Sequence, residues 1–417
     1  MEGSPGARKT ALSELPRAAA AAKRGGPRVC IIGGGGTGAA LAYDLSLRGC
    51  AVILLERGEL TSGTTGRHHG QLHCGARYAW ADRNIARECF EESVTLSRIA
   101  EGCIEYNGGL FVATDDEEAD RVQEFMAALA ESGIPARRVP PAEALALEPA
   151  LNPALKAVVS VPDGSFDAFR LPLMFCTAAR NLGAEILPWH EVVAVEFERG
   201  RARYVTVMDR SSPEPKESRI EADFFVSATG VWAGKLGSLA GLDVPISPAP
   251  GTMVAVRGRI VDRVVSRLRP PGDGDILVPQ RGLSIIGTTQ RFSGDSEFYS
   301  PTEEECRFLV SAAAEMVPEF ANLPMHAAWT AARPLFGKAS SETEGRALSR
   351  DFGVIDHEST DGLAGFATII GGKATVLRAM AEKTADLVCR KLGVSAPCRT
   401  KDYLLPSWRD FYREKRP

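Results

Sequence analysis

The chain has 417 residues, 44% of them hydrophobic and 24% charged, which suffices for a sizeable core and fits two ordinary globular domains. The formal charge of −4 and the pI near 6.0 exclude the basic surface typical of nucleic-acid binding, and no apolar run reaches the length of a membrane span. Nine cysteines without a CxxC pair indicate reduced thiols and argue against an iron–sulfur centre in this chain.

The N-terminal residues 1–27 are rich in Ala, Arg, Lys and Gly, and we expect them to form a disordered tail. A targeting peptide fits this segment less well, because Glu2 and Glu14 are present and no amphipathic arginine face is evident. Regular structure is therefore expected from about residue 28.

Residues 29–56 have the pattern of a strand, a glycine-rich turn, a helix and a second strand that ends at Glu56. Gly33 allows a tight turn, Gly35 lets the backbone approach a pyrophosphate, and Gly38 lets the helix pack close to the strand. The start of the helix offers unpaired N–H groups to that pyrophosphate, and Glu56 has the spacing of a carboxylate that accepts ribose hydroxyls. The segment predicts a dinucleotide site but does not separate FAD from NAD.

The stretch 62–78 is too small and too polar to be a core strand. It is dense in glycines, hydroxyls and imidazoles, which suits a loop laid against a polar, extended ligand. His68, His69, His73 and Cys74 lie within seven positions. The ligand geometry of a metal site and a second cluster are missing, so no metal is expected.

The rest of the chain alternates between helical and strand patterns in an order that suggests two interleaved domains. Helices are expected at 84–103, 117–131, 169–182, 301–316 and 375–392, and strands at 110–114, 185–187, 192–208 (a hairpin), 222–227, 276–278, 283–286 and 365–370. The stretch 211–217 is expected to be a polar loop, and 246–336 an antiparallel sheet.

Several ordered motifs resemble the FAD-dependent glycerol-3-phosphate dehydrogenases, and among them the flavin-bearing A subunit of the anaerobic enzyme. The resemblance runs from about 29 to 406, through the loop 62–78 and the motifs at 107–111, 161–164, 275–279, 286–289, 333–335 and 371–373. It implies the D-amino acid oxidase-like fold class, which is α/β, with a glutathione reductase-type FAD-binding Rossmann domain interleaved with an antiparallel-sheet α+β substrate domain. The implied boundaries are 28–104, 161–245 and 337–395 for the FAD domain, 105–160 and 246–336 for the substrate domain, and 396–417 for a C-terminal tail.

By the same resemblance the cofactor is FAD, and the residues implied to bind it lie in four separate stretches of the chain. They are Gly33, Gly35, Gly36, Thr37, Gly38, Glu56, Arg57, Ser62, Gly63, Thr64, Thr65, His68, His69, Gln71, Leu72, His73, Val192, Val193, Ala228, Thr229, Gly230, Trp232, Gly371, Gly372, Lys373 and Ala374.

The residues expected to act on the substrate come from three distant segments. The family pattern puts His73, Arg77 and Tyr78 beside the substrate, and Arg333 on its phosphate, since a guanidinium suits a phosphate. Lys373 would face the flavin edge where negative charge develops on reduction. An imidazole titrates near neutral pH, so His73 is the expected proton acceptor.

Alternatives remain at two points of this assignment. His68 or His69 could take the proton instead of His73, or could bind FAD. Related sequences carry a tyrosine at the position of Leu377, so one hydroxyl contact to flavin or substrate is lost or replaced.

The expected function is oxidation of sn-glycerol 3-phosphate to dihydroxyacetone phosphate by hydride transfer to FAD. One alternative is a stand-alone oxidase or dehydrogenase of another phosphorylated, phosphonate or carboxylated hydroxy or amino compound. Another is a flavin-binding subunit of a larger electron-transfer complex. The family's flavin-bearing chain carries a C-terminal Cys-rich domain that has no counterpart after Trp408, so the usual electron path is not expected in this chain.

The partners expected are therefore a small anionic substrate and an electron acceptor, which could be a quinone, a partner subunit or oxygen. The expected location is the cytoplasm, or the inner face of the membrane by peripheral association.

Overall fold

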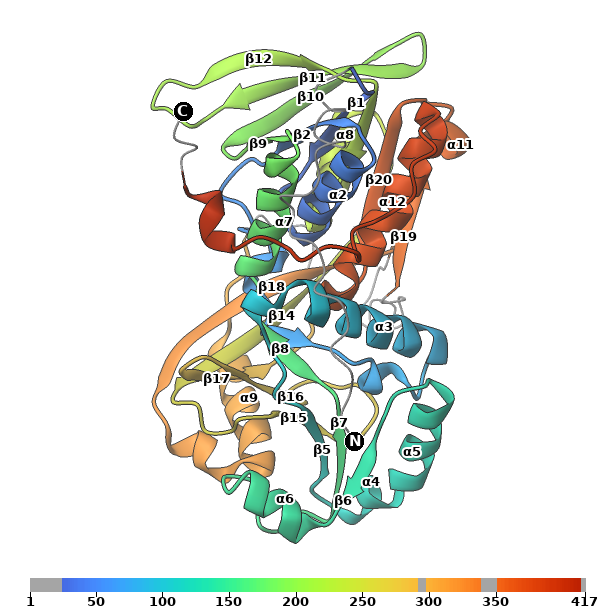
Figure 1. The fold of residues 1–417 in the computed structure, drawn as a ribbon. Helices are drawn as coiled ribbons and strands as arrows, with labels where there is room; N and C mark the ends of the chain where they lie inside the picture. Colours follow the sequence, from blue (N-terminus) through green and yellow to red (C-terminus); the bar gives the residue numbers. More distant parts are fainter. Residues whose placement is uncertain (1–24, 292–297, 339–350, 414–417) are drawn as a thin grey trace.

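The computed structural model describes residues 25–291, 298–338 and 351–413, which form two units stacked one above the other (Figure 1). The upper unit is built on a six-stranded sheet. β1 pairs in parallel with β2 and β13, and β13 with β20, while β19 is antiparallel at one edge. Across this sheet the strands are β19 (Phe352–Asp356), β20 (Phe366–Gly371), β13 (Phe224–Ser227), β1 (Arg28–Ile32), β2 (Ala51–Leu55) and β9 (Glu185–Leu187).

One face of the six-stranded sheet is covered by three packed helices, and the other by one helix and a three-stranded antiparallel sheet (Figure 1). The first layer consists of α2 (Gly36–Leu47), α7 (Arg170–Asn181) and α12 (Leu377–Leu392). The second layer consists of α8 (Ala233–Leu239), β10 (His190–Glu198), β11 (Arg201–Asp209) and β12 (Lys216–Glu221). Successive strand residues point to opposite faces, so Val29 and Ile31 join the helical layer while Cys30 and Ile32 join the other.

The lower unit is built on an eight-stranded sheet with an apolar core on each face. In order across the sheet the strands are β18 (Met325–Phe336), β14 (Ile246–Arg257), β17 (Leu283–Gly287), β16 (Ile276–Gln280), β15 (Val264–Arg267), β5 (Gly109–Ala113), β7 (Ala157–Val161) and β6 (Arg137–Val139). Leu110 and Val112 pack in the core that includes α9 (Glu303–Met316), whereas Phe111 and Ala113 pack on the opposite side. This alternation is the two-residue period of a strand that is buried on both faces.

A short sheet and one helix lie where the two units meet. The sheet consists of β3 (Gln71–Leu72), β8 (Gly164–Phe166) and β4 (Ile104–Glu105), and the helix is α3 (Arg83–Ile99). The Asp82 side chain caps α3 by accepting hydrogen bonds from the backbone N–H groups of Asn84 and Ile85. Pairing of β3 with β8 fixes the polar loop 62–78 at this boundary.

Two local predictions are wrong. The expected helix 117–131 is divided at Arg121 into α4 (Asp116–Asp120) and α5 (Val122–Glu131); the buried Glu118 of α4 pairs with Arg267, a contact with a distant segment that the sequence pattern does not carry. The expected loop 211–217 ends in the edge strand β12, whose residues are almost all exposed and polar. An edge strand of this kind carries no hydrophobic pattern from which it could be recognised.

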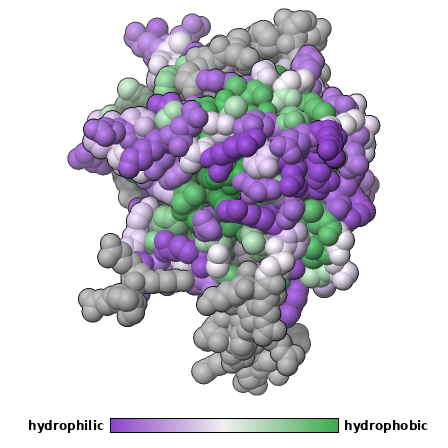
Figure 2. All heavy atoms as spheres, turned by 90° about the horizontal axis from the view of Figure 1, so that it is seen from above, coloured by the Kyte–Doolittle hydropathy of each residue, from purple (hydrophilic) through white to green (hydrophobic). Residues whose placement is uncertain are grey.

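The structure describes only part of each chain end. The expected N-terminal tail lies, up to residue 24, outside the described residues. The C-terminal segment runs along the upper unit as far as residue 413 (Figure 1). Within this segment the Trp408 ring is stacked by Arg170 and Arg409. Seen from above, the surface is largely hydrophilic with apolar patches (Figure 2). Within the ranges described, none of the helices combines the length and the apolar character that crossing a bilayer requires.

Candidate functional site

A cavity of about 810 Å³ lies where the two units meet. It is lined by the turn after β1, the loop 62–73, the start of β10, the segment after β13, the end of β18, and the segment between β20 and α12. The predicted residues that line it are Gly33, Gly35, Gly36, Thr37, Glu56, Arg57, Ser62, Gly63, Thr64, Thr65, His68, His69, Gln71, His73, Tyr78, Val192, Val193, Ala228, Thr229, Gly230, Trp232, Arg333, Gly371, Gly372, Lys373 and Ala374. Gly38, Leu72 and Arg77 are predicted site residues that do not line it.

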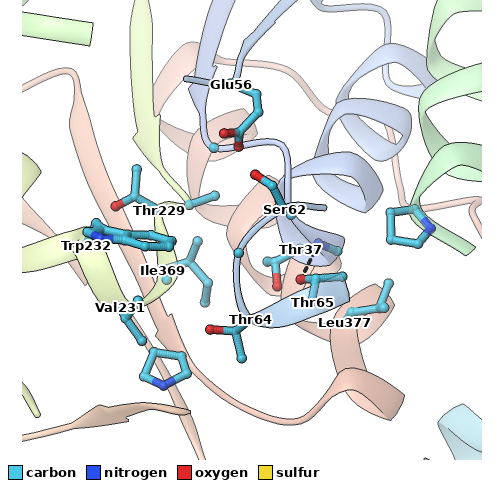
Figure 3. Close-up of a pocket in the computed structure, with 18 of the residues that line it drawn as sticks. Thr37, Glu56, Ser62, Thr64, Thr65, Thr229, Val231, Trp232, Ile369 and Leu377 are labelled. Atoms are coloured by element: carbon cyan, nitrogen blue, oxygen red, sulfur yellow. Dashed lines mark hydrogen bonds between the residues drawn. The ribbon is translucent and has the colours of Figure 1, made fainter. Parts of the chain in front are cut away.

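The glycine-rich turn packs tightly against the end of β13. Gly33 has a φ of +114°, and a Cβ atom added to it would lie 2.5 Å from the carbonyl oxygen of Ala228. A Cβ on Gly38 would lie 2.0 Å from the carbonyl oxygen of Gly33, so Gly38 serves the close packing of α2 on the turn. The Gly36 N–H at the start of α2 donates to Thr65 Oγ1 at 3.0 Å, and Figure 3 shows this contact in the cavity wall.

An acidic side chain, Glu56, and a tryptophan, Trp232, both line the cavity (Figure 3). The carboxylate of Glu56 accepts hydrogen bonds from Gly34 N–H at 2.8 Å and from Gly58 N–H at 2.9 Å, which fixes it at the end of β2 with lone pairs left over. The Arg57 guanidinium stacks over the Trp232 ring at 4.2 Å. The Trp232 Nε1–H is buried and has no partner within the part of the chain that the structure describes.

His68 and His69 are locked in the same tautomer. Nδ1 of His68 accepts the Gly70 N–H at 2.9 Å, and Nδ1 of His69 accepts the Gln71 N–H at 3.2 Å. Burial lowers the pKa of His68 to about 4; burial and the nearby charges of His68 and Arg333 lower the pKa of His69 to about 3. Both rings are therefore neutral at neutral pH and carry their proton on Nε2, which makes Nε2 a donor. Neither Nε2 can accept a proton from a substrate.

His73 is held differently. Its backbone N–H donates to Thr375 Oγ1 at 3.0 Å, and its ring lies 5.5 Å from the ring of Tyr78. Burial and the nearby charges of His69, Arg77 and Lys373 hold the pKa of His73 well below 6.5, so this imidazole is neutral at neutral pH. No backbone N–H of the described residues occupies a ring nitrogen of His73, which thus retains an acceptor nitrogen in the cavity wall.

Two cations line the same part of the cavity as His73. Arg333 lies near the end of β18, and its guanidinium donates to Thr288 Oγ1. The ammonium group of Lys373 lies over the Tyr78 ring, 4.7 Å from its centroid. The pairing of β18 with β14 carries Arg333 from the lower unit to the cavity. The structure thus brings together His73, Tyr78, Arg333 and Lys373.

Arg77 is not among the cavity residues. It is 6% exposed, and its Nη2 donates to Asp275 Oδ2 at 3.0 Å and to the Gly272 carbonyl oxygen at 2.9 Å. The fully buried Asp275 also accepts from Arg269 at 2.6 Å. The geometry supports a positioning role for Arg77 in a buried ion-pair network, from which its charge lowers the pKa values of His69 and His73.

Further cavity residues were not predicted from the sequence. They include Arg67, Pro172, Trp189, His190, Glu191, Val231, Lys235, Leu236, Leu239, Asp351, Ile369 and Met380. His190 reaches the site because its N–H donates to the Glu56 carbonyl oxygen at 2.8 Å, a pairing between distant segments that leaves no local signal. Arg67 lies within the polar loop 62–78, and this position in the sequence is the signal from which it could have been predicted as a cavity residue.

Comparisons with known proteins give a consistent result. The family described as "FAD dependent oxidoreductase" (DAO) matches residues 28–387. The chain is 41% identical to the A1 subunit of the anaerobic glycerol-3-phosphate dehydrogenase of Haloferax volcanii, over 92% of this chain and 67% of that protein. It is 40% identical to the A subunit of the Escherichia coli K12 enzyme of the same name, over 91% and 70%. In fold it is similar to the FAD-bound glycerol-3-phosphate dehydrogenase of Bacillus halodurans, with a TM-score of 0.68 and 23% identity over 94% of this chain and 70% of that one.

Proposed function

The chain belongs to the DAO family of FAD-dependent oxidoreductases, and from this premise we propose that it oxidises sn-glycerol 3-phosphate to dihydroxyacetone phosphate. The predicted fold class and the FAD cofactor are confirmed by the same comparisons. The observation that carries the proposal is that the neutral His73, Arg333 and Lys373 line the same cavity. Oxidation of a secondary alcohol that bears a phosphate calls for a proton acceptor and for cationic donors to the phosphate.

The cavity fits FAD by its own features. The turn at Gly33 leaves no room for a side chain, Glu56 is fixed with free lone pairs, and the buried Nε1–H of Trp232 and Nε2–H of His68 are donors that require an acceptor-rich ligand. Gly36 at the start of α2 would hold the pyrophosphate. Bound FAD supplies a two-electron acceptor for the hydride that leaves the alcohol carbon.

The protein's own groups account for the rest of the proposed reaction. His73 accepts the hydroxyl proton at the ring nitrogen that carries none, while His68 and His69 act only as donors. Arg333 and Lys373 bind the phosphate and orient the alcohol carbon.

The departure at Leu377 bears little on the substrate. Its Cδ2 lies 3.2 Å from the position that a Cβ on Gly36 would occupy, at the start of α2 (Figure 3). The missing hydroxyl therefore belongs to the nucleotide end of the cavity, and its loss gives no ground for preferring another hydroxy or amino compound to glycerol 3-phosphate.

The electron acceptor belongs to the proposal as well. Two of the relatives are named as subunits of an anaerobic enzyme, and this favours a partner subunit or a quinone over oxygen. We place the protein in the cytoplasm, or peripherally on the inner face of the membrane. Parallel assays of quinone or dye reduction and of peroxide formation distinguish these acceptors.

The decisive experiment mixes the purified FAD-loaded protein with sn-glycerol 3-phosphate without oxygen. The flavin absorbance near 450 nm should bleach within seconds, since enzymes typically turn over about 1–1000 times per second, and dihydroxyacetone phosphate should form in equal amount. A yellow protein that stays oxidised with this substrate, yet bleaches with another hydroxy acid or phosphonate, would overturn the substrate assignment and leave the family membership intact.

A further inference from the structure

The side-chain oxygen of Gln71, Oε1, is a buried hydrogen-bond acceptor without a donor among the described residues. The residue is 2% exposed and lines the cavity. Its Nε2 donates to Asp163 Oδ2 at 2.9 Å, whereas its Oε1 is buried and has no partner among the described residues. A buried acceptor left unpaired costs free energy, so an atom of this kind indicates a donor that arrives with a ligand.

The orientation of the Gln71 amide is dictated by Asp163. Asp163 Oδ2 accepts from the NH2 group of Gln71, and this contact turns the Gln71 carbonyl oxygen away from Asp163. Asp163 is itself fixed, since it is 4% exposed and its Oδ1 accepts the Cys74 N–H at 2.7 Å. The amide of Gln71 is therefore not free to rotate and exchange its oxygen for its nitrogen.

The position of Gln71 on its strand places it between two other site residues. His69, Gln71 and His73 all line the cavity, whereas Gly70, Leu72 and Cys74 do not. This is the two-residue alternation of an extended chain, which directs every second side chain to the same side. Along this edge the cavity offers a fixed donor at His69, a fixed acceptor at Gln71 and a proton acceptor at His73.

We propose that Gln71 Oε1 accepts a hydrogen bond from a substrate hydroxyl next to the one that is oxidised, and that Gln71 thereby sets substrate specificity. This inference rests on the proposed function. Glycerol 3-phosphate has three polar groups: the phosphate is assigned to Arg333 and Lys373, and the C2 hydroxyl to His73. The C1 hydroxyl is the one that remains, and it is a donor that suits Gln71.

The test compares sn-glycerol 3-phosphate with propane-1,2-diol 1-phosphate of the same configuration, which lacks only the C1 hydroxyl. For the unaltered enzyme kcat/KM should be higher for glycerol 3-phosphate by about 10- to 100-fold, because the analogue leaves Gln71 Oε1 unpaired. Gln71→Leu keeps a similar volume without the acceptor, and it should remove most of this preference. Its FAD dissociation constant and flavin absorption spectrum should match those of the unaltered protein.

A second variant changes the chemistry of the group rather than its size. In Asp163→Asn the new NH2 can donate to Gln71 Oε1 once the Gln71 amide turns over, so the cavity receives a donor in place of an acceptor. This variant should fold, retain FAD and lose the preference for glycerol 3-phosphate. Gln280→Leu serves as the control, since Gln280 Nε2 donates to the carbonyl oxygens of Gly70 in the loop and of Phe166 at the end of β8, but Gln280 does not line the cavity. It should lower kcat/KM for both substrates equally.

Three results would overturn the assignment. The first is an unchanged preference in Gln71→Leu, and the second is an equal loss of preference in Gln280→Leu. The third is weaker FAD binding in Gln71→Leu with the preference intact, which would assign the acceptor to the flavin ring. If the unaltered enzyme oxidises neither compound, the proposed function fails and this inference fails with it, whereas the first three results refute the inference alone.

Discussion

The ion pair between Arg77 and Asp275 allows a direct test of whether Arg77 binds substrate or supports the site. Asp275 is fully buried and accepts from Arg77, from Arg269 and from the Gly272 N–H. Removing one partner of a buried pair costs about 3–5 kcal/mol, because the other charge is left uncompensated. Asp275→Asn should lower the free energy of unfolding by an amount in this range, because Arg77 then keeps only the Gly272 carbonyl oxygen as a partner. Arg77→Met should cost less, because Asp275 keeps Arg269 and the Gly272 N–H.

The assay is urea unfolding of the FAD-loaded protein, followed by tryptophan fluorescence and by release of the flavin. The double variant should lose less stability than the sum of the two single variants, with a coupling energy of about 1–3 kcal/mol for residues in one network. In Arg77→Met, KM for substrate should change far less than in Arg333→Ala. The reasoning is refuted if Arg77→Met raises KM as strongly as Arg333→Ala, while Asp275→Asn unfolds at the urea concentration of the unaltered protein.

The other predictions concern the residues that act on the substrate. Arg333→Ala should raise KM by roughly 10- to 150-fold, which corresponds to about 1.5–3 kcal/mol for a charged hydrogen bond, and should leave FAD bound. An unchanged KM in steady-state kinetics would show that the phosphate binds elsewhere. His73→Gln should lower kcat by about 10²–10⁴-fold, whereas His69→Gln should leave the proton-transfer step intact. Stopped-flow flavin reduction in the two variants measures this difference. A larger loss of rate in His69→Gln than in His73→Gln would identify His69 as the proton acceptor. Because the pKa of His73 lies well below 6.5 and the neutral ring accepts the proton, kcat/KM should stay level from pH 8 down through pH 6.5 and fall only in more acid solution; an acid limb centred at or above pH 6.5 would contradict this.

The parts of the site that could be predicted are those in which neighbours along the chain act together. The turn at Gly33, the acid at Glu56 and the polar loop 62–78 all lie within one short segment, and their spacing carries the geometry of a dinucleotide site. The structure puts them in one cavity wall as expected. Arg333 was also placed beside the cavity, although its arrival depends on the pairing of β18 with β14.

The parts that could not be predicted depend on contacts between distant segments. The role of Arg77 depends on Asp275, which lies 198 positions away in the sequence. Likewise the orientation of Gln71 depends on Asp163, and the tautomers of His68 and His69 depend on backbone angles that bring a particular N–H onto Nδ1. Residue type alone is the same for a histidine that donates and for one that accepts, so no sequence pattern could separate these roles.

The charges around His73 give the site a further property once an anion is bound. In the free protein Arg77 and Lys373 both oppose protonation of His73, which keeps the ring neutral but also makes it a weak base. If the substrate phosphate binds beside Arg333 and Lys373 as proposed, its negative charge offsets that positive field, and we expect the pKa of His73 to rise when the substrate occupies the cavity. The ring is thus available as an acceptor before binding and becomes a stronger base after it. Substrates without the anion lose both the contact and this increase in basicity, so a neutral polyol should be a poor substrate in kcat as well as in KM.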